Sequence, residues 1–340
     1  QFGKIQLLYL LQRRWMQTLL YRLNKNLGMI IVLHRVVPSM CDLSSDPLLR
    51  HRSIAITVES LDRAIQYFNS KGYTFVSLSQ LEKCLTNHVK NKKFISFTFD
   101  DGYRDNFLYA YPLMKKYKVP FTIYLTTGLP DHSQCLWWFY LEDWIETGTP
   151  INFDFMDNRF SFRCQNNQDK RDAFAKLAIY LENTSTEIQA RFISEILGPR
   201  FGDPIEKTRI YSMNWEQIRF LSRDPLATIA SHGIFHSNLT SLTTLELEKN
   251  LIHSKIRIEQ EIDQPVVHFA YPFGHIRAFN ENVMRTVKRS GYLTAVTTLH
   301  GTLKPKDSNN LFRLPRICLN NKSDPWLELL STGLPRRLYM

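Results

Sequence analysis

The chain has 340 residues and a mass of 40.0 kDa, which is enough for one large domain or two ordinary ones. With 44% hydrophobic and 22% charged residues and only 13 Gly and 15 Pro, the composition excludes a disordered, collagen-like or linker-dominated chain. The formal net charge of +11 on its own suggests nucleic acid or an anionic membrane as a partner.

The excess positive charge is concentrated at the two ends of the chain. Residues 1–28 contain five basic residues and no acidic one, and the last six residues add Arg336 and Arg337. Residues 29–334 therefore carry only about +4, without a run of basic residues interleaved with aromatic ones. We therefore expect no nucleic-acid partner.

Residues 1–28 place Leu7, Leu11 and Trp15 at helical spacing among arginines. This pattern predicts a basic amphipathic helix, which either packs on the main domain or contacts an anionic membrane peripherally. The apolar run is too short to span a bilayer, and nothing resembles a signal peptide. Together with five cysteines that form no CxxC pair, this favours a cytoplasmic or peripheral membrane location, with an exported or periplasmic one as the alternative. Because the sequence opens with Gln1 rather than Met, we also expect a segment upstream.

From residue 29 onward, short apolar runs typical of buried strands alternate with amphipathic runs of helical period. The expected strands are residues 29–33, 74–78, 94–99, 121–125, 228–230, 267–270 and 293–297. The expected helices are residues 58–71, 81–86, 106–117, 215–222, 246–262 and 281–290. This alternation predicts an α/β fold in which about seven parallel strands close into a distorted (β/α) barrel.

Residues 131–213 interrupt the alternation, because they are rich in aromatic residues and polar helix formers. We interpret them as a helical and aromatic insertion at the carboxyl end of the barrel. The neighbouring Trp137 and Trp138 either line a sugar groove or form the core of the insertion. The expected parts are a basic helix (1–28), a barrel (29–130 and 214–334), the insertion (131–213) and a basic tail (335–340).

Two adjacent acidic residues, Asp100 and Asp101, directly follow the expected strand 94–99. They therefore lie at its carboxyl end, where parallel α/β folds place catalytic groups. Two adjacent carboxylates repel each other, so burying both is unfavourable unless a cation or proton separates their roles. One carboxylate on a metal and the other acting as a base would satisfy this requirement, although Asp-Asp-Gly also occurs as a simple turn.

Two histidines, His232 and His236, follow the expected strand 228–230. Their spacing of four residues presents both imidazoles to one side, as in many sites for divalent metals. With one carboxylate they make a three-ligand site that leaves positions open for water and substrate. Such a site suits Zn²⁺ best, with Co²⁺, Ni²⁺ or Mn²⁺ as alternatives.

A third motif, Phe269 to Gly274, follows the expected strand 267–270. Its Pro272 and Gly274 are typical of a tight turn, whose exposed N–H groups are suited to stabilising an oxyanion. Taken alone, the motif indicates only a turn.

The three motifs together, in this order and at strand ends, resemble the polysaccharide deacetylases of carbohydrate esterase family 4, which share the NodB-homology domain. The resemblance covers roughly residues 29–319, with the insertion unaccounted for. By position, it implies that Asp100 is the catalytic base and that Asp101 and the two histidines bind the metal. It also implies that the backbone N–H of Phe273 donates to the oxyanion.

The chain departs from the family pattern at two places. Ala270 stands where an arginine that orients the catalytic base often opens the third motif. No clear Leu-x-His motif follows either, and the late region offers only His300, in an expected loop. A circularly permuted subgroup, similar to exported poly-N-acetylglucosamine deacetylases, carries that histidine on its first strand, where this chain has His34. The resemblance therefore implies His34 as the general acid, with a structural histidine as the alternative.

Residues 311–317 also resemble the end of the permuted subgroup. Arg313 or Arg316 is a candidate to replace the missing arginine or, for Arg316, to contact substrate, although a salt bridge to the barrel wall is the favoured role. His268 and His275 flank the third motif and are expected to be structural or adjacent to substrate. The other candidate substrate contacts are Tyr271, Trp137 and Trp138.

The resemblance implies a metal-dependent deacetylase that hydrolyses the N-acetyl group of an N-acetylhexosamine in a polysaccharide or surface glycan. An O-acetyl esterase of the xylan type would use the same residues. A catalytically impaired glycan-binding homologue is a further alternative, because Ala270 replaces the family arginine. The implied partner is an N-acetylated glycan, and the sequence leaves the oligomeric state open.

Overall fold

The computed structural model describes residues 26–41, 53–87, 93–319, 321 and 327. The predicted helix of residues 1–28 lies almost wholly outside these ranges, and the predicted tail of residues 335–340 lies wholly outside them. Among the helices of the described part of the chain, none is long and apolar enough to cross a bilayer.

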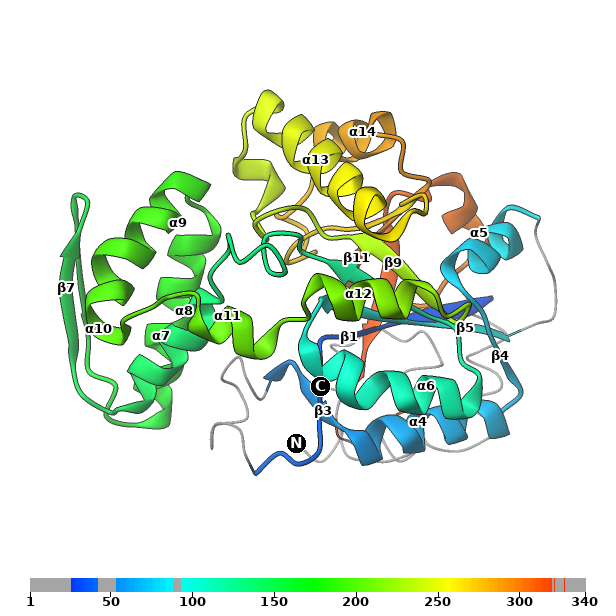
Figure 1. Ribbon diagram of the computed structural model, residues 1–340, viewed down its shortest axis with the longest axis horizontal. Coiled ribbons are helices and arrows are strands. Elements are labelled where there is room, and N and C mark those ends of the chain that lie inside the picture. Colours follow the sequence, from blue (N-terminus) through cyan, green and yellow to red (C-terminus); the bar gives the residue numbers. More distant parts are fainter. Residues whose placement is uncertain (1–25, 42–52, 88–92, 320, 322–326, 328–340) are drawn as a thin grey trace, which may run out of the picture.

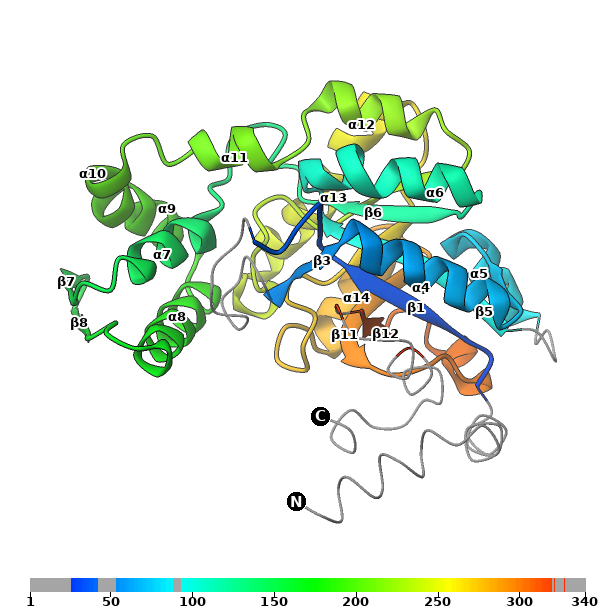
Figure 2. The ribbon, with the colours of Figure 1, turned by 90° about the horizontal axis from the view of Figure 1, so that it is seen from below.

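Seven parallel strands form a closed barrel that helices surround (Figure 1, Figure 2). They are β1 (Gly28–Leu33), β5 (Lys93–Asp101), β6 (Phe121–Leu125), β9 (Ala227–Ser231), β10 (His268–Ala270), β11 (Thr294–His300) and β12 (Leu314–Cys318). Their hydrogen-bonded order is β1-β12-β11-β10-β9-β6-β5, and the pairing of β5 with β1 closes the ring. The predicted distorted (β/α) barrel is confirmed.

Three further short strands lie next to the barrel. β4 (Tyr73–Phe75) pairs with the first part of β5. Just beyond the end of β1, β2 (Arg35–Val37) pairs in parallel with β3 (Ala55–Thr57). This second pair lies at the end of the barrel where the functional motifs are found.

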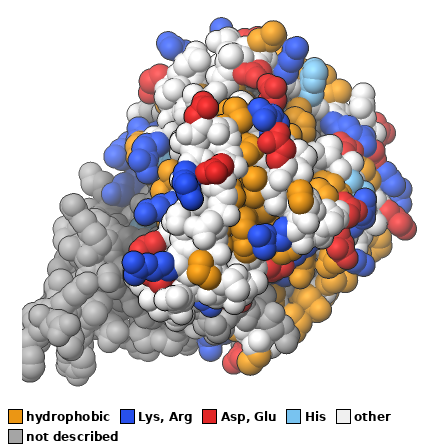
Figure 3. All heavy atoms as spheres, turned by 90° about the vertical axis from the view of Figure 1, so that its left-hand side faces the viewer, with side chains coloured by type: hydrophobic (Ala, Val, Ile, Leu, Met, Phe, Trp, Pro, Cys, Tyr) orange, Lys and Arg blue, Asp and Glu red, His pale blue; other side chains and the backbone are white. Residues whose placement is uncertain are grey.

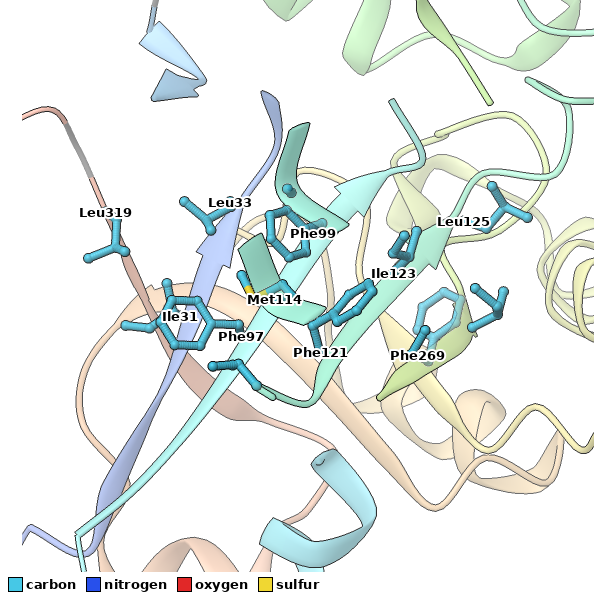
Figure 4. Packing of buried hydrophobic residues seen from close by; sticks show 14 of the residues in the cluster. Ile31, Leu33, Phe97, Phe99, Met114, Phe121, Ile123, Leu125, Phe269 and Leu319 are labelled. Atoms are coloured by element: carbon cyan, nitrogen blue, oxygen red, sulfur yellow. The ribbon is translucent and has the colours of Figure 1, made fainter. Parts of the chain in front are cut away.

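Side chains on the barrel strands alternate between two faces, so two hydrophobic cores form. Phe97 and Phe99 of β5 and Phe121 and Ile123 of β6 belong to the larger core, between the strands and the surrounding helices (Figure 4). The residues that alternate with them line the barrel interior. The apolar residues of this inner core on the strands are Ile30, Phe94, Tyr124, Ala230, Ala270, Val296 and Leu314.

The surrounding helices are α4 (Val58–Ser70), α6 (Tyr111–Tyr117), α12 (Trp215–Ser222), α13 (Thr244–Ile262) and α14 (Glu281–Arg289). Most begin at a residue whose side chain accepts a hydrogen bond from the first turn, such as Thr57 for α4 and Thr243 for α13. One more helix, α5 (Leu78–Thr86), places its leucines in the inner core near the starts of the strands. It therefore closes the amino end of the barrel and leaves the opposite end for the motifs.

The segment between β6 and α12 forms a mainly helical unit beside the barrel, on the left in Figure 1. It contains α7 (Trp137–Glu146), the hairpin β7 (Ile151–Phe155) and β8 (Asn158–Phe162), α8 (Asn167–Glu182), α9 (Thr186–Phe192), α10 (Gly198–Phe201) and α11 (Glu206–Tyr211). It has a hydrophobic core of its own, rich in aromatic side chains. Basic and acidic side chains are interspersed over this side of the molecule (Figure 3), with pairs such as Arg191–Glu195 and Arg209–Asp203.

The predicted elements differ from the observed ones mainly at their ends. Ser77 caps α5, so this helix begins at Leu78 and β4 is correspondingly shorter than predicted. The predicted helix 106–117 begins as a π-helical turn, Asn106–Ala110. Strand β11 runs on to His300, so the loop predicted around that residue is wrong. Strand β12 was missed because two of its five residues, Pro315 and Arg316, weaken the apolar pattern.

Candidate active site

The three sequence motifs meet at the carboxyl end of the barrel. Asp100 and Asp101 are the last residues of β5, His232 follows β9 directly, and Phe273 lies three residues after β10. These strands are parallel, and β6 and β9 pair in register up to Leu125 and Ser231. The motifs are therefore brought to one rim, as parallel-strand topology predicts.

Asp101, His232 and His236 form a buried cluster at this rim. Oδ1 of Asp101 lies 3.5 Å from Nε2 of His232 and 3.3 Å from Nε2 of His236. Both carboxylate oxygens of Asp101 are buried without a hydrogen-bond partner among the described residues. Ligands of a tetrahedral zinc ion, with bonds of about 2.0–2.1 Å, lie about 3.3 Å from one another. The two distances from Asp101 match this value, and the three donor atoms lie within 4.8 Å of one another, so the cluster fits a divalent cation.

The His232 ring is held by a hydrogen bond. Its Nδ1 lies 2.7 Å from the carbonyl oxygen of Ala270, so the Nδ1–H donates and the lone pair of Nε2 faces Asp101. Burial lowers the pKa of His232 to about 4. The ring is therefore neutral at pH 7, which is the state that a metal ligand requires.

The His236 ring is held differently. It is buried, and its Nδ1 has no hydrogen-bond partner in the described part of the chain. Two aromatic rings contact it instead: the ring centre of Trp138 lies 5.3 Å away and that of Phe273 lies 4.6 Å away. Its orientation thus depends on aromatic packing rather than on a hydrogen bond.

Asp100, next to Asp101, is fully paired. Arg316 of β12 donates from Nη1 to one oxygen and from Nη2 to the other, both at 2.6 Å. The guanidinium is itself anchored, since it also donates to Thr98 and to the carbonyl of Thr297. Burial alone would raise the pKa of Asp100, but the charge and hydrogen bonds of Arg316 hold it below its ordinary value. Arg316 thus forms a salt bridge with a residue of barrel strand β5, and its partner is the residue that the missing arginine was expected to orient.

His34 lies between β1 and β2, with its Nε2 3.9 Å from Oδ2 of Asp100 and its side chain 16% exposed. The backbone around it is held by two residues that follow the acidic motif. Asn106 donates to the His34 carbonyl, and Asp105 accepts from the Arg35 side chain and the Val36 N–H. His34 is the one described histidine with a ring nitrogen within 4 Å of an Asp100 oxygen.

The third motif forms the turn predicted for it. Phe273 has a φ of 61° and Gly274 one of 63°, and a Cβ at Gly274 would lie 2.6 Å from the Thr298 nitrogen. Thr298 holds this turn by donating from Oγ1 to the Phe273 carbonyl and from its N–H to the Gly274 carbonyl. The Phe273 N–H has no hydrogen-bond partner among the residues that the structure describes. It is therefore available to a ligand at the rim.

Three residues of this site other than glycine have a positive φ: Asp101 (72°), His236 (50°) and Phe273 (61°). Such backbone is unfavourable for residues with a Cβ and persists where the surrounding structure imposes it. At Asp101 it ends the extended strand. Asp100 can therefore meet Arg316 inside the barrel while Asp101 meets the histidines.

A sequence model of the family described as polysaccharide deacetylase matches residues 87–154 and 188–295, together more than half of the chain. The chain belongs to the polysaccharide deacetylase family. The matched ranges include the acidic motif, both histidines and the third motif. The residues left out between them, 155–187, include β8 and α8 of the helical unit.

A curated relative in this family is YxkH of Bacillus subtilis (strain 168), which its name assigns to the polysaccharide deacetylases. It is 26% identical over 119 residues, and the aligned region covers 33% of this chain and 43% of YxkH. The chain thus matches less than half of the length of this relative.

Solved structures of similar fold include the Streptococcus pyogenes deacetylase PplD in complex with acetate, with a TM-score of 0.57 and 19% identity over 90% of this chain and 98% of that one. IcaB from Ammonifex degensii has a TM-score of 0.56 and 16% identity, covering 91% of this chain and 98% of its own. The polysaccharide deacetylase BC0361 from Bacillus cereus has a TM-score of 0.55 and 16% identity, covering 90% of this chain and 69% of its own. At these identities the likeness concerns the fold.

The candidate substrate contacts lie away from solvent. Tyr271 is fully buried, stacks on Phe279 and donates from its hydroxyl to the Phe312 carbonyl, so it has no exposed surface with which to bind a sugar. Trp137 is 4% and Trp138 2% exposed, and both belong to the core of the helical unit. Their packing corresponds to the alternative in which they form the core of the insertion.

The remaining histidines of the late region lie in separate places. His268 is at the amino end of the barrel, bonded to Ser79 and Thr294, and is structural. His275 lies at the rim, where its Nε2 is 2.5 Å from Glu182 at the end of α8. His300 is the register partner of Arg316 on β11.

Sequence reasoning missed Asp105, Asn106 and Thr298, which hold the backbone of the site. The first two follow the acidic motif directly, and their residue types are suited to bonding nearby backbone groups. That signal was present in the sequence. The position of Thr298 depends on how β11 lies against the third-motif turn, so no local pattern indicated it.

Proposed function

We propose that this protein is a metal-dependent deacetylase that hydrolyses the N-acetyl group of an N-acetylhexosamine in a polysaccharide or surface glycan. The observation that carries the proposal is the contrast between two adjacent buried carboxylates: Asp100 is paired with Arg316, and Asp101 faces two histidines without a hydrogen bond. Membership of the polysaccharide deacetylase family supports the class of reaction.

Asp101, His232 and His236 are the residues that would hold the cation, because their donor atoms converge in a buried cluster. When bound there, a divalent cation supplies Lewis-acid polarisation of the acetyl carbonyl and lowers the pKa of water. One carboxylate and two imidazoles suit Zn²⁺, with Co²⁺, Ni²⁺ and Mn²⁺ as alternatives.

Asp100 acts as the general base in this proposal. Arg316 keeps its carboxylate ionised and fixed in place, and each oxygen retains a further lone pair that can accept a hydrogen bond. Asp100 takes a proton from the attacking water as the oxygen of that water bonds to the acetyl carbon.

Phe273 and His34 act after the water has attacked the acetyl carbon. The Phe273 N–H donates a hydrogen bond to the oxygen that becomes negative when the carbonyl carbon turns tetrahedral. His34, protonated, then gives its proton to the nitrogen as the C–N bond breaks. The products are acetate, which contains the oxygen of the water, and a sugar with a free amine.

The test is acetate release by the full chain from N-acetylglucosamine oligomers and from acetylated xylan, before and after treatment with a chelator. We expect release from the oligomers, its loss after chelation and its return with added Zn²⁺, Co²⁺, Ni²⁺ or Mn²⁺. Release from acetylated xylan alone would instead identify an O-acetyl esterase.

Binding of Zn²⁺ without acetate release from either substrate would indicate a glycan-binding homologue and contradict the proposal. The reason for considering that alternative was the alanine at position 270. Because Arg316 pairs with Asp100 in the way expected of the missing arginine, the substitution at position 270 does not by itself argue against catalysis.

The division into a barrel, an insertion at residues 131–213 and basic ends is also a proposal, as is contact of residues 1–28 with anionic lipid. The five basic residues of that segment support the contact. Deleting residues 1–25, which keeps Leu27 and Gly28 with their hydrogen bonds to the barrel, should reduce binding to vesicles that contain anionic lipid and leave acetate release from small soluble substrates unchanged. Equal vesicle binding with and without the segment would contradict it.

A further inference from the structure

Trp138, in the first turn of α7, connects the helical unit to the candidate metal cluster. Its ring centre lies 5.3 Å from that of His236, with the two planes inclined by 52°. The indole is 2% exposed, so this contact is made in the interior of the protein. His236 is thus packed against a residue that lies outside the barrel strands and their motifs.

The position of Trp138 is itself fixed from several sides. Its Nε1–H donates to the hydroxyl of Tyr103 at 3.1 Å. The rings of Trp137 and Phe139 lie edge-on to it, with centres 5.2 and 6.2 Å away. Tyr103 follows Asp101 by two residues and is fully buried. Trp138 therefore links the loop of the acidic motif to the loop of the second histidine.

The two candidate histidine ligands differ in how their rings are oriented. The His232 ring donates from Nδ1 to the Ala270 carbonyl, an arrangement common for histidines that bind metals. His236 has no equivalent, because its buried Nδ1 lacks a partner among the described residues. Aromatic contacts are what restrict rotation of this ring about its side-chain bonds.

We propose that Trp138 is a positioning residue for His236, which directs the Nε2 of this ring toward Asp101. The helical unit thereby takes part in building the metal cluster and is more than an addition beside the barrel. This inference rests on the metal site of the proposed function.

The test measures the affinity of the full chain for Zn²⁺ by competition with a chromophoric chelator, together with the rise in melting temperature on adding Zn²⁺. Trp138→Ala should weaken Zn²⁺ binding by about 10–100-fold, the range found when partners that orient metal ligands are removed. Trp138→Phe, which keeps an aromatic ring and loses the N–H, should restore most of the affinity.

Trp144→Ala is the matched control. Trp144 lies on the same helix and is 3% exposed, but it contacts Phe153 and Arg200 in the core of the helical unit. This control should lower the melting temperature and leave the affinity for Zn²⁺ unchanged. If Trp138→Ala does not fold, Trp138→Leu carries the same expectation, because it keeps apolar volume without an aromatic ring.

Three results would overturn the inference. One is wild-type affinity for Zn²⁺ in Trp138→Ala, and another is an equal loss of affinity in the Trp138 and Trp144 variants. The third is a wild-type chain that fails to bind Zn²⁺, which would also remove the metal site of the proposed function. The first two leave the proposed function intact, so the two failures can be told apart.

Discussion

Asp100 and Asp101 are adjacent and equally inaccessible to solvent, but they belong to two differently built sides of the rim. On the inner side, Asp100 receives two hydrogen bonds from Arg316, which is anchored inside the barrel. On the outer side, Asp101 receives none and faces two histidines. A buried carboxylate without a partner is unfavourable unless a cation neutralises it. The barrel thus fixes Asp100 with an arginine, whereas Asp101 remains for the cation of the proposed function.

The largest expected effects come from neutralising each carboxylate in turn. Asp101→Asn should weaken Zn²⁺ binding by more than about 100-fold, because a charged ligand is lost. Asp100→Asn should leave Zn²⁺ binding close to that of wild type and should lower the melting temperature of the metal-free protein, because Arg316 is left buried without its counter-charge. The affinity for Zn²⁺ and the melting temperature of the metal-free protein are measured for both variants, and an equal loss of Zn²⁺ affinity in the two would contradict the contrast between the two sides.

The next effect concerns the inner side alone. Arg316→Met should destabilise the protein by about 3–5 kcal/mol, because it leaves Asp100 buried and unpaired. Combining it with Asp100→Asn should recover part of this loss, which denaturant unfolding of the four proteins of the cycle would measure. The control is Arg313→Met. Arg313 lies three residues earlier and its side chain is exposed, so this substitution should change the free energy of unfolding little. Additive effects of the two buried substitutions would show that the pair is not coupled.

The next prediction concerns two buried histidines, His232 at the rim and His268 at the other end of the barrel, and its expected effect is smaller. Burial lowers the pKa of His268 to about 4, as it does for His232. Because the unfolded chain binds this proton more readily, the contribution of His268 to stability is present above about pH 6.5 and is lost as the pH falls toward 4.

His268→Gln should therefore reduce the loss of stability between pH 7 and pH 5 by about 1–2 kcal/mol. The matched control is His253→Gln, at an exposed histidine, which should leave the loss of stability between pH 7 and pH 5 unchanged. Unfolding by denaturant across this pH range is the measurement. Identical pH profiles for wild type and His268→Gln would contradict the assignment.

The smallest effect concerns the third-motif turn. Thr298→Val removes the hydroxyl that donates to the Phe273 carbonyl and keeps the backbone hydrogen bond to Gly274. Loss of one such bond is worth about 0.5–1.5 kcal/mol, so we expect kcat to fall by about 2–10-fold. An unchanged kcat with a lowered melting temperature would mean that backbone bonds alone hold the turn.

The barrel was predictable from sequence because its strands are short apolar runs separated by amphipathic helices with clear caps. The acidic motif and the histidine pair were predictable as one site because strand ends in a parallel barrel meet at one rim. Strand β12 was not predictable, since Pro315 and Arg316 obscure its apolar pattern. The role of Arg316 depends on β1 lying between β12 and β5, which requires contacts between residues far apart in sequence.

The helical unit was predictable as an interruption but not in its relation to the site. Aromatic residues at 137 and 138 fit a sugar groove and a core equally well from sequence. Only the packing shows that Trp138 contacts His236 while Trp144 lies in the core of the unit.

One measurement on Asp100→Asn tests most directly whether Asp100 serves as the base beside an independent metal cluster. Bound Zn²⁺ per chain and the rate of acetate release from N-acetylglucosamine oligomers are determined on the same preparation. We expect Zn²⁺ bound as in wild type and acetate release lowered by about 10²–10⁴-fold, the usual contribution of a general base. Acetate release at the wild-type rate would contradict it.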